Sequence, residues 1–428
     1  LIVTTMTSSG EEWMDFEECS MRKLESVITA SKFDDESVPT NSSTEQRRVE
    51  ESVIAKYDLF IKSRYLCAQL PVLRKKEHIQ FVTQSIAHLS AKSEPLDASR
   101  AWIVFWIVNS LSLLKYPISD SHVDHIIGFI KRLQCPSGGF GGGPGQFPHL
   151  APTYAAVSAL CSLGTEKAYT VIDRSSLYQF LKSLKNPNGS FSMHEGGEVD
   201  VRGVYCALAV AKLTNIYTDE LFETCSAWVK SCQNYEGGFA AGPGLEAHGG
   251  YTHCSLAALI MLNKSNDCDL PSLIRWIVSR QTKLEGGFNG RTNKLVDGCY
   301  SFWQGGSFPL IHQILLDAGD LDLNMRQYLF NHVALQEYLL ICCQYTVGGL
   351  IDKPGKRPDL YHTFYCLSGL SIAQHFICNH FYHENIVGPM KNELDVMHPV
   401  FNITLKSAEK AVRYFSCLKI PAVDEVTR

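Results

Sequence analysis

The stretch LVDGCYSFW, residues 295–303, brings a carboxylate, a thiol, a phenol and an indole close together in the chain. Asp297 and Cys299 are separated by one residue, and His362 stands at a nearly equivalent place in the following repeat. Carboxylate, thiolate and imidazole can all bind zinc, and three protein ligands with an open fourth position are typical of a catalytic zinc site. The alternative is that Cys299 and His362 are unrelated core residues.

A second polar group surrounds this stretch and consists of His248, Arg291, Lys294 and Tyr300. Arginine offers a planar fork of donors and lysine a point charge, and both bind phosphate oxygens well. The tyrosine hydroxyl can add a hydrogen bond. The nearby glycine-rich loops match neither a P-loop nor a dinucleotide fingerprint, so a nucleotide is not indicated. The alternative is that these are ordinary solvated loop charges.

A repeat with a period near 50 residues must position these groups. Its mark is a glycine turn that ends at Phe140, Phe191, Phe239, Phe288 or Leu350. The apolar spacing predicts an amphipathic helix before each turn and a more apolar helix after it. A period of this length is typical of arrays of helical hairpins. The expected first helices are 123–134, 175–185, 220–233, 270–281 and 334–344.

The second helices are consistently more apolar than the first, which suits an inner ring of buried helices inside an outer ring. We therefore predict an all-α fold, an α-α barrel (α/α toroid) of about six hairpins over residues 46–380. Residues 1–45 are rich in Ser, Thr, Glu and Asp and are expected to form a loosely ordered N-terminal arm. Residues 381–428 are expected to be a C-terminal extension.

Alignment of the second helices places large rings at one level of the barrel. Such rings would line its centre with apolar, polarisable walls that suit a long hydrocarbon. Aromatic residues at helical spacing are also typical of ordinary core packing. A polar level lies three residues earlier and holds Ala151, Arg202, Tyr251, Tyr300 and His362. The aromatic level reads Trp102, Tyr154, Tyr205, Cys254, Trp303 and Tyr365.

Composition limits the possible functions. The chain has 428 residues, 45% of them hydrophobic and 19% charged, with a net charge of −5 that offers no basic field for nucleic acid. Its 15 cysteines include no C-x-x-C pair, which is typical of reduced core residues in a cytosolic protein. No secretion signal is apparent, and the longest apolar run, 102–114, is too short to span a bilayer. We expect a soluble, cytoplasmic protein.

The polar groups and the hydrocarbon wall together predict alkylation of a thiol by an allylic diphosphate. A free thiol has a pKa of about 8.5 and is mostly protonated at neutral pH. Zinc coordination favours the thiolate. The cations would stabilise the charge that develops on the departing diphosphate.

The stretches GRTNKLVDGCYSFW (290–303) and PDLYHT (358–363), with the five glycine turns, resemble the beta subunits of protein prenyltransferases, and the farnesyltransferases most closely. The resemblance runs from about Ser99 to Leu370. It implies a catalytic group of Asp297, Cys299, His362 and Tyr300, of which the first three hold one zinc ion. It further implies a diphosphate site of His248, Arg291, Lys294 and Tyr300, completed by a lysine of an alpha subunit in a heterodimer. The implied isoprenoid contacts are Trp102, Tyr154, Arg202, Tyr205, Gly250, Tyr251, Cys254 and Trp303.

The resemblance also implies the substrates. Relatives that take the longer geranylgeranyl chain carry a small residue where this chain has Trp102, so Trp102 and Tyr365 together imply farnesyl diphosphate. Asp352 matches a position linked to magnesium assistance. The acceptor would be the cysteine of a C-terminal C-a-a-X motif, as in small GTPases. The implied peptide pocket consists of Ala98, Ser99, Trp102, Trp106, His149, Ala151, Pro152 and Tyr361.

Three other functions fit parts of the pattern. A geranylgeranyltransferase type I beta subunit would share the motifs, but Trp102, Tyr365 and Asp352 argue against it. A terpene cyclase would share the helical barrel, but it needs no thiol-binding zinc, and neither the D-D-x-x-D nor the D-x-D-D motif is apparent. A non-enzymatic helical scaffold would explain the hairpins but not the coincidence of zinc ligands, cations and aromatic residues.

Overall fold

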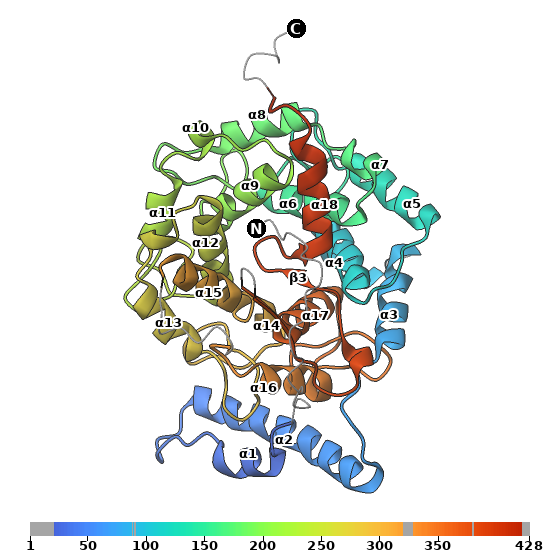
Figure 1. The fold of residues 1–428 in the computed structure, drawn as a ribbon, viewed down its shortest axis with the longest axis vertical. Helices are drawn as coiled ribbons and strands as arrows, with labels where there is room; N and C mark the ends of the chain where they lie inside the picture. Colours follow the sequence, from blue (N-terminus) through green and yellow to red (C-terminus); the bar gives the residue numbers. More distant parts are fainter. Residues whose placement is uncertain (1–20, 88, 90, 320–327, 379–380, 422–428) are drawn as a thin grey trace, which may run out of the picture.

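The computed structural model describes residues 21–87, 89, 91–319, 328–378 and 381–421. Figure 1 shows helices arranged in a ring, as predicted for an α-α barrel. Each inner helix contacts the next one, and the last contacts the first, which closes the ring. The inner helices are α4 (Arg100–Leu113), α6 (Leu150–Leu163), α9 (Val201–Leu213), α12 (Gly249–Met261), α14 (Tyr300–Trp303) with α15 (Ser307–Asp317), and α17 (Leu360–Gln374).

An outer ring surrounds the inner one, and its helices expected over 220–233 and 270–281 are shorter than the sequence predicts. The third, expected over 220–233, is interrupted after Phe222 because Thr224 takes a left-handed conformation with φ of 63°. The outer helices are α3 (Lys75–Ala87), α5 (Asp120–Lys131), α8 (Arg174–Leu184), α11 (Cys225–Ser231), α13 (Leu270–Val278) and α16 (His332–Glu337), which continues into the π-helical turn η3 (Tyr338–Cys342). Short helical turns connect them: η1 (Ala91–Ser99), α7 (Glu166–Tyr169), α10 (Asp219–Phe222) and η2 (Ser265–Asp267).

The glycine turns bring each hairpin against the next. The first glycine of each turn has a φ between 84° and 109°, which side chains rarely tolerate. A Cβ atom at Gly138 would lie 1.9 Å from the carbonyl oxygen of Ser176 in α8. At Gly348, the last turn, it would lie 2.2 Å from the carbonyl oxygen of Glu77 in α3, the first outer helix. The repeated glycine therefore permits the backbone contact that closes the ring.

The N-terminal segment packs on the outside of the ring beside α16 (Figure 1) and forms α1 (Leu24–Ala30) and α2 (Asn41–Cys67). The side chain of Arg22 forms an ion pair with Glu337, whose side chain is 0% exposed. The hydroxyl of Tyr57 donates to the carbonyl of Glu285 at 2.6 Å. The expectation of a loosely ordered arm is therefore wrong for residues 21–45, and residues 1–20 lie outside the described part.

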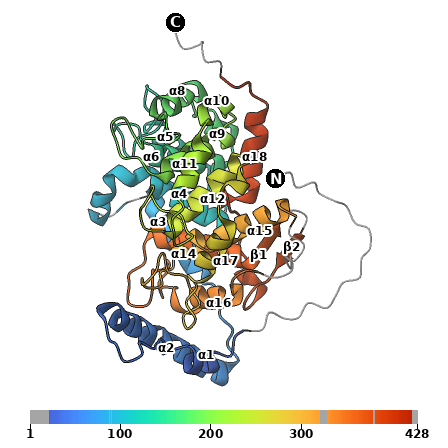
Figure 2. The same cartoon turned by 90° about the vertical axis from the view of Figure 1, so that its left-hand side faces the viewer.

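The C-terminal extension covers one end of the barrel. It contains β2 (Phe381–Glu384), which pairs with β1 (His375–Cys378), then η4 (Met390–Asn392), the paired strands β3 (Met397–His398) and β4 (Ile403–Thr404), and α18 (Leu405–Ser416). Figure 2 shows α18 and the β1–β2 hairpin on the same side of the ring.

Two tyrosines of the inner ring hold this extension in place. The hydroxyl of Tyr154 donates to the carbonyl of Phe401 at 2.7 Å, and that of Tyr205 to the carbonyl of Val400 at 2.9 Å. The hydroxyl groups of these two tyrosines thus meet the C-terminal segment rather than solvent. No helix among the described residues is both long and apolar enough to cross a membrane.

The buried ion pair should decide whether the N-terminal helices stay docked. We predict that Arg22→Met lowers the free energy of unfolding by roughly 3–5 kcal/mol, because it leaves the buried charge of Glu337 without a counter-charge and with the Arg22 amide, at 2.7 Å, still bonded to it. Urea unfolding of the variant and the unchanged protein measures the difference. The matched control is Arg48→Met, which removes an exposed ion pair with Glu45 and should cost less than about 1 kcal/mol. Equal losses in the two variants would contradict the prediction.

Candidate active site

The rings of the aromatic level form a continuous belt around the inside of the barrel. His253, fully buried on α12, fills the gap between Tyr205 and Trp303 that the sequence alignment assigned to Cys254. The ring centroids of successive members lie between 4.7 and 6.2 Å apart. The order is Trp102, Tyr154, Tyr205, His253, Trp303, Tyr365, Tyr361 and Trp106, which again contacts Trp102.

The remaining residues expected against the isoprenoid lie near this belt. Burial raises the pKa of the Cys254 thiol, so this cysteine is a neutral wall residue. Arg202, in the first turn of α9, donates two hydrogen bonds to Asp200, at 2.9 and 2.6 Å. Gly250 and Tyr251 begin α12, where the Tyr251 ring lies 5.2 Å from that of His248. Arg202 is therefore a charge-compensated residue at the edge of the belt rather than an isolated cation.

The three expected zinc ligands converge from two neighbouring hairpins. Asp297 and Cys299 lie immediately before α14, and His362 lies in the first turn of α17. One donor atom from each residue lies within 4.8 Å of the other two, and His362 Nε2 is 3.3 Å from Asp297 Oδ1. The amide of Cys299 donates to the same Asp297 oxygen at 2.9 Å, which orients the carboxylate.

A fourth residue, Asp359, orients the imidazole of His362. The Nδ1–H of His362 donates to Asp359 Oδ2 at 2.7 Å, and the His362 amide donates to Oδ1 at 2.7 Å. A carboxylate on Nδ1 fixes the ring and leaves Nε2 for a metal, as in many zinc sites. Asp359 is not among the residues predicted for the site, although an aspartate at the N-cap of a predicted helix was a usable signal.

The charges of these groups fit a cation between them. Burial raises the pKa of the Cys299 thiol to about 12. Burial alone would raise the pKa of Asp297 and lower that of His362. Hydrogen bonds outweigh burial at both residues, so the pKa of Asp297 falls to about 2 and that of His362 rises to about 12. A carboxylate oxygen, a thiol and an oriented imidazole form a ligand set that suits zinc. The charge of the zinc ion would replace that of the proton on His362.

His248 and Tyr300 form a directional hydrogen-bonded pair. Nδ1 of His248 accepts the amide of Gly250 at 3.1 Å, so the neutral ring carries its proton on Nε2. Burial, followed by the charge of Arg291, lowers the pKa of His248 to about 4, which keeps the ring neutral. Its Nε2 therefore donates to the Tyr300 hydroxyl at 2.9 Å. The phenolic proton of Tyr300 is left to donate to an oxygen of a bound substrate.

The two cations of the expected diphosphate site lie on the loop before Asp297. Arg291 pairs with Glu246 at 2.9 Å, and both side chains are about half exposed. Lys294 is exposed and lines a cavity of about 840 Å³ between this loop and the N-terminal segment. Gly290 makes room for the site, because a Cβ atom there would lie 2.0 Å from the Tyr300 ring.

Asp352, the expected magnesium residue, lies on the loop before α17. Its carboxylate forms an ion pair with Lys353. Burial, and then the charge of Asp297, raises the pKa of Asp352. Among the described residues, Asp352 belongs to no group of three candidate metal ligands. Magnesium would therefore need oxygens of a bound diphosphate to complete its shell.

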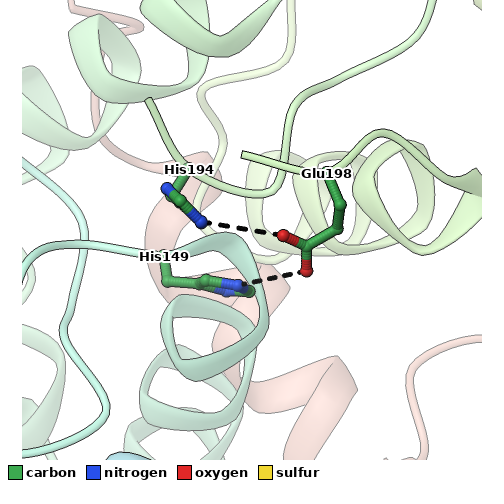
Figure 3. A group of neighbouring side chains, drawn as sticks. All are labelled: His149, His194 and Glu198. Carbon is green, nitrogen blue, oxygen red and sulfur yellow. Dashed lines mark ion pairs between the residues drawn. The ribbon is translucent and has the colours of Figure 1, made fainter. Parts of the chain in front are cut away.

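Figure 3 shows a second group of residues with possible metal-ligand atoms, formed by His149, His194 and Glu198. Glu198 lies 3.7 Å from His149 Nε2 and 3.6 Å from His194 Nε2. Nδ1 of His149 accepts the amide of Ala151 at 3.0 Å, so the neutral ring carries a proton on Nε2 and has no lone pair for a metal. Arg202 lies 3.9 Å from the same carboxylate. This group suits hydrogen bonding better than metal binding.

The residues expected in the peptide pocket come from three neighbouring hairpins, those of α17, α4 and α6. His149 caps α6, and Ala151 and Pro152 follow in its first turn. Ala98 and Ser99 end η1, immediately before α4. The rings of Trp102, Trp106 and Tyr361 complete the set through their contacts in the belt.

Comparisons with known proteins give the family of the chain. The model of the prenyltransferase alpha-alpha toroid domain matches residues 73–403. The chain is 41% identical to protein farnesyltransferase subunit beta of Pisum sativum, over 82% of this chain and 99% of the relative. It is also 41% identical to that subunit of Schizosaccharomyces pombe, over 79% of this chain and 90% of the relative.

This chain belongs to the family of protein farnesyltransferase beta subunits. A geranylgeranyl transferase type-1 subunit beta of Arabidopsis thaliana is 36% identical, over 55% of this chain and 65% of the relative. Among solved structures, the geranylgeranyltransferase-I of Candida albicans in complex with GGPP shares the fold, with a TM-score of 0.64 and 24% identity. That match covers 82% of this chain and 100% of the other.

Asp359 should tune the metal site without being a ligand. We predict that Asp359→Asn weakens zinc affinity by about 10- to 100-fold, because the amide cannot hold the His362 ring as the carboxylate does. Competition with a chromophoric chelator measures the affinity. Asp269→Asn is the control, because Asp269 caps α13 in the same way but touches no metal ligand. A zinc affinity equal in both variants would count against the role of Asp359.

Proposed function

We propose that this chain is the catalytic beta subunit of a zinc-dependent protein farnesyltransferase. It transfers a farnesyl group from farnesyl diphosphate to the cysteine thiol of a C-terminal C-a-a-X motif. The observation that carries the proposal is the convergence of three groups: the ligands Asp297, Cys299 and His362, the hydrogen-bonded pair of His248 and Tyr300, and the aromatic belt. An isoprenoid transferase needs all three within reach of one substrate.

The belt would hold the hydrocarbon, because large rings give an apolar wall of high contact area. It also keeps water away from the reacting carbon. The diphosphate would then meet Arg291, Lys294 and the Tyr300 hydroxyl at the rim. Tyr300 donates its proton to a phosphate oxygen while His248 holds the phenol in place, and the cations stabilise the charge that builds as the diphosphate departs.

The acceptor thiol would approach from the side of the zinc ligands. A zinc ion held by Asp297, Cys299 and His362 would supply the charge that keeps the substrate thiol deprotonated at neutral pH. Asp359 fixes the imidazole, and the amide of Cys299 fixes the carboxylate of Asp297. The protein thus presents oriented ligands rather than side chains that must reorganise.

The peptide would lie at the end of the barrel where α4 and α6 begin. Its last residue would lie near Ala98, Ser99, Trp106, His149, Ala151 and Pro152. The group of His149, His194, Glu198 and Arg202 offers donors and an acceptor for the polar end of that peptide. These side chains support recognition by direct or water-mediated hydrogen bonds.

The site is completed by an alpha subunit that supplies a further lysine, and magnesium assists at Asp352. We place the reaction in the cytoplasm, because every cysteine whose side chain the structure describes is a free thiol and several are deeply buried. The second candidate is a geranylgeranyltransferase. The rings of Trp102 and Tyr365 favour farnesyl, because both occupy the belt and shorten the space available to an isoprenoid.

Cysteine 299 should be required for zinc and for transfer but not for folding. We predict that Cys299→Ala loses bound zinc and farnesyl transfer while its thermal unfolding stays close to that of the unchanged protein, because packing of α14 on α17 and the bond from the Gly298 amide to Asp352 already hold the two hairpins together. Metal analysis, a peptide farnesylation assay and circular dichroism measure the three properties. Cys232→Ala, a buried cysteine on the outer ring, is the control and should keep zinc. Near-normal turnover in Cys299→Ala would refute the assignment.

The size of residue 102 should set the length of the isoprenoid. We predict that Trp102→Thr accepts geranylgeranyl diphosphate, because loss of the indole removes a wall that contacts Tyr154 and Phe105. Product mass after competition between the two diphosphates gives the preference. Trp228→Thr, on the outer helix α11, removes equal bulk elsewhere and should leave the preference unchanged. An unaltered preference in Trp102→Thr would show that another residue limits the length.

A further inference from the structure

The side chains of the diphosphate site come from two consecutive loops. His248 follows the glycine turn at Gly237, and Arg291 and Lys294 follow the turn at Gly286. A diphosphate could engage both loops only if their separation is held constant. The contacts that hold the two loops at a fixed separation are therefore as important as the cations themselves.

One carboxylate joins the two loops. Glu236 accepts the amide of Ala247 at 3.0 Å and the hydroxyl of Thr292 at 3.3 Å, through different oxygens. Ala247 immediately precedes His248, and Thr292 immediately follows Arg291. The carboxylate of Glu236 thus connects the backbone next to His248 with the side chain next to Arg291.

The surroundings of Glu236 keep this link in place. Asn234 donates a further hydrogen bond to the carboxylate at 3.0 Å, and Arg280 donates to the Thr292 hydroxyl at 3.2 Å. Burial works against ionisation of Glu236, but its hydrogen bonds outweigh burial and lower its pKa. The group is ionised at neutral pH and accepts charge-assisted hydrogen bonds, which are stronger than neutral ones.

We propose that Glu236 is a positioning residue for the prenyl diphosphate, which fixes the distance between His248 and Arg291. The inference rests on the proposed function and adds a residue that contacts no substrate. Glu246 reinforces the same junction, because its carboxylate pairs with Arg291 from the loop of His248. That pair is exposed on both sides, whereas the link through Glu236 ends on a backbone amide.

The next repeat provides a matched control. Glu285 occupies the equivalent position before the following glycine turn. Its carboxylate, however, accepts a hydrogen bond from the side-chain amide of Gln46 in α2 at 2.9 Å and faces the N-terminal segment. The two residues have the same type and the same place in the repeat, and only Glu236 connects the loops of the site. Comparison of Glu236→Ala with Glu285→Ala therefore distinguishes the effect of breaking the link between the two loops from the general effect of removing a carboxylate at this position of the repeat.

The experiment uses the full chain with its alpha subunit and measures steady-state transfer of farnesyl to a C-a-a-X peptide. Glu236→Ala should raise the KM for farnesyl diphosphate about tenfold, as expected for loss of a charge-assisted hydrogen bond. The kcat at saturation, the KM for the peptide and the zinc content should change much less. Glu236→Gln should recover part of the lost affinity, because its amide can bond both Ala247 and Thr292 but carries no charge. Glu285→Ala should leave the KM for farnesyl diphosphate unchanged.

Thr292→Val tests the same link from its exposed end if Glu236→Ala folds poorly. It should raise the same KM, and the double variant should be no worse than Glu236→Ala alone, because both changes break one connection. Titration with inorganic diphosphate gives an independent affinity. A KM unchanged in both Glu236→Ala and Thr292→Val, or raised equally by Glu285→Ala, would overturn the role of Glu236 and leave the proposed function standing. Absence of both farnesyl transfer and diphosphate binding in the unchanged protein would overturn the two together.

Discussion

Ring closure depends on a backbone contact that only glycine permits. In each hairpin, the first glycine of the turn lies against a carbonyl at the start of the next outer helix, and at Gly348 that helix is the first one, α3. A side chain at such a place would force neighbouring hairpins apart, since a Cβ atom would overlap the backbone. Small displacements between neighbouring hairpins would add up around a closed ring and prevent its closure, whereas an open array could accommodate them by bending.

The proposed zinc ligands depend directly on this closeness. Asp297 and Cys299 belong to one hairpin, while His362 and Asp359 belong to the next, so the ligand set exists only when the two hairpins are in register. Gly298, between the first two ligands, donates its amide to the carbonyl of Asp352 at 2.7 Å. A Cβ atom there would lie 2.6 Å from the sulfur of Cys366 in α17. The ligand stretch is therefore docked on the neighbouring hairpin through its own backbone.

The repeat and the aromatic level were predictable from the sequence because both are periodic. Periodicity located the hairpins, the inner position of the apolar helices and the rings from Trp102 to Tyr365. It could not reveal that His253 takes the place in the belt expected for Cys254, because one residue of helical rotation decides which side chain meets Tyr205. Side-chain chemistry suggested phosphate binding by Arg291 and Lys294, and the family resemblance completed the expected diphosphate site.

Contacts between segments that are distant in sequence were beyond prediction. The bond from Tyr154 to Phe401 requires the C-terminal segment to lie across the barrel, and nothing in its composition indicates that position. The docking of Arg22 on Glu337 is similar, because an isolated arginine in a polar segment reads as solvated. Such pairs reflect the shape of the finished barrel, which neither residue encodes alone.

Helix capping explains why only one of three related histidines suits a metal. His149 and His248 cap α6 and α12, and each uses Nδ1 to accept an amide of its own helix. A neutral ring held in that way carries its proton on Nε2 and can only donate, as His248 does to Tyr300. In α17 the cap is Asp359, which frees Nδ1 of His362 to donate and turns Nε2 toward Asp297 and Cys299. The choice of aspartate or histidine at the start of an inner helix thus separates a hydrogen-bond donor from a metal ligand at nearly the same place in the barrel.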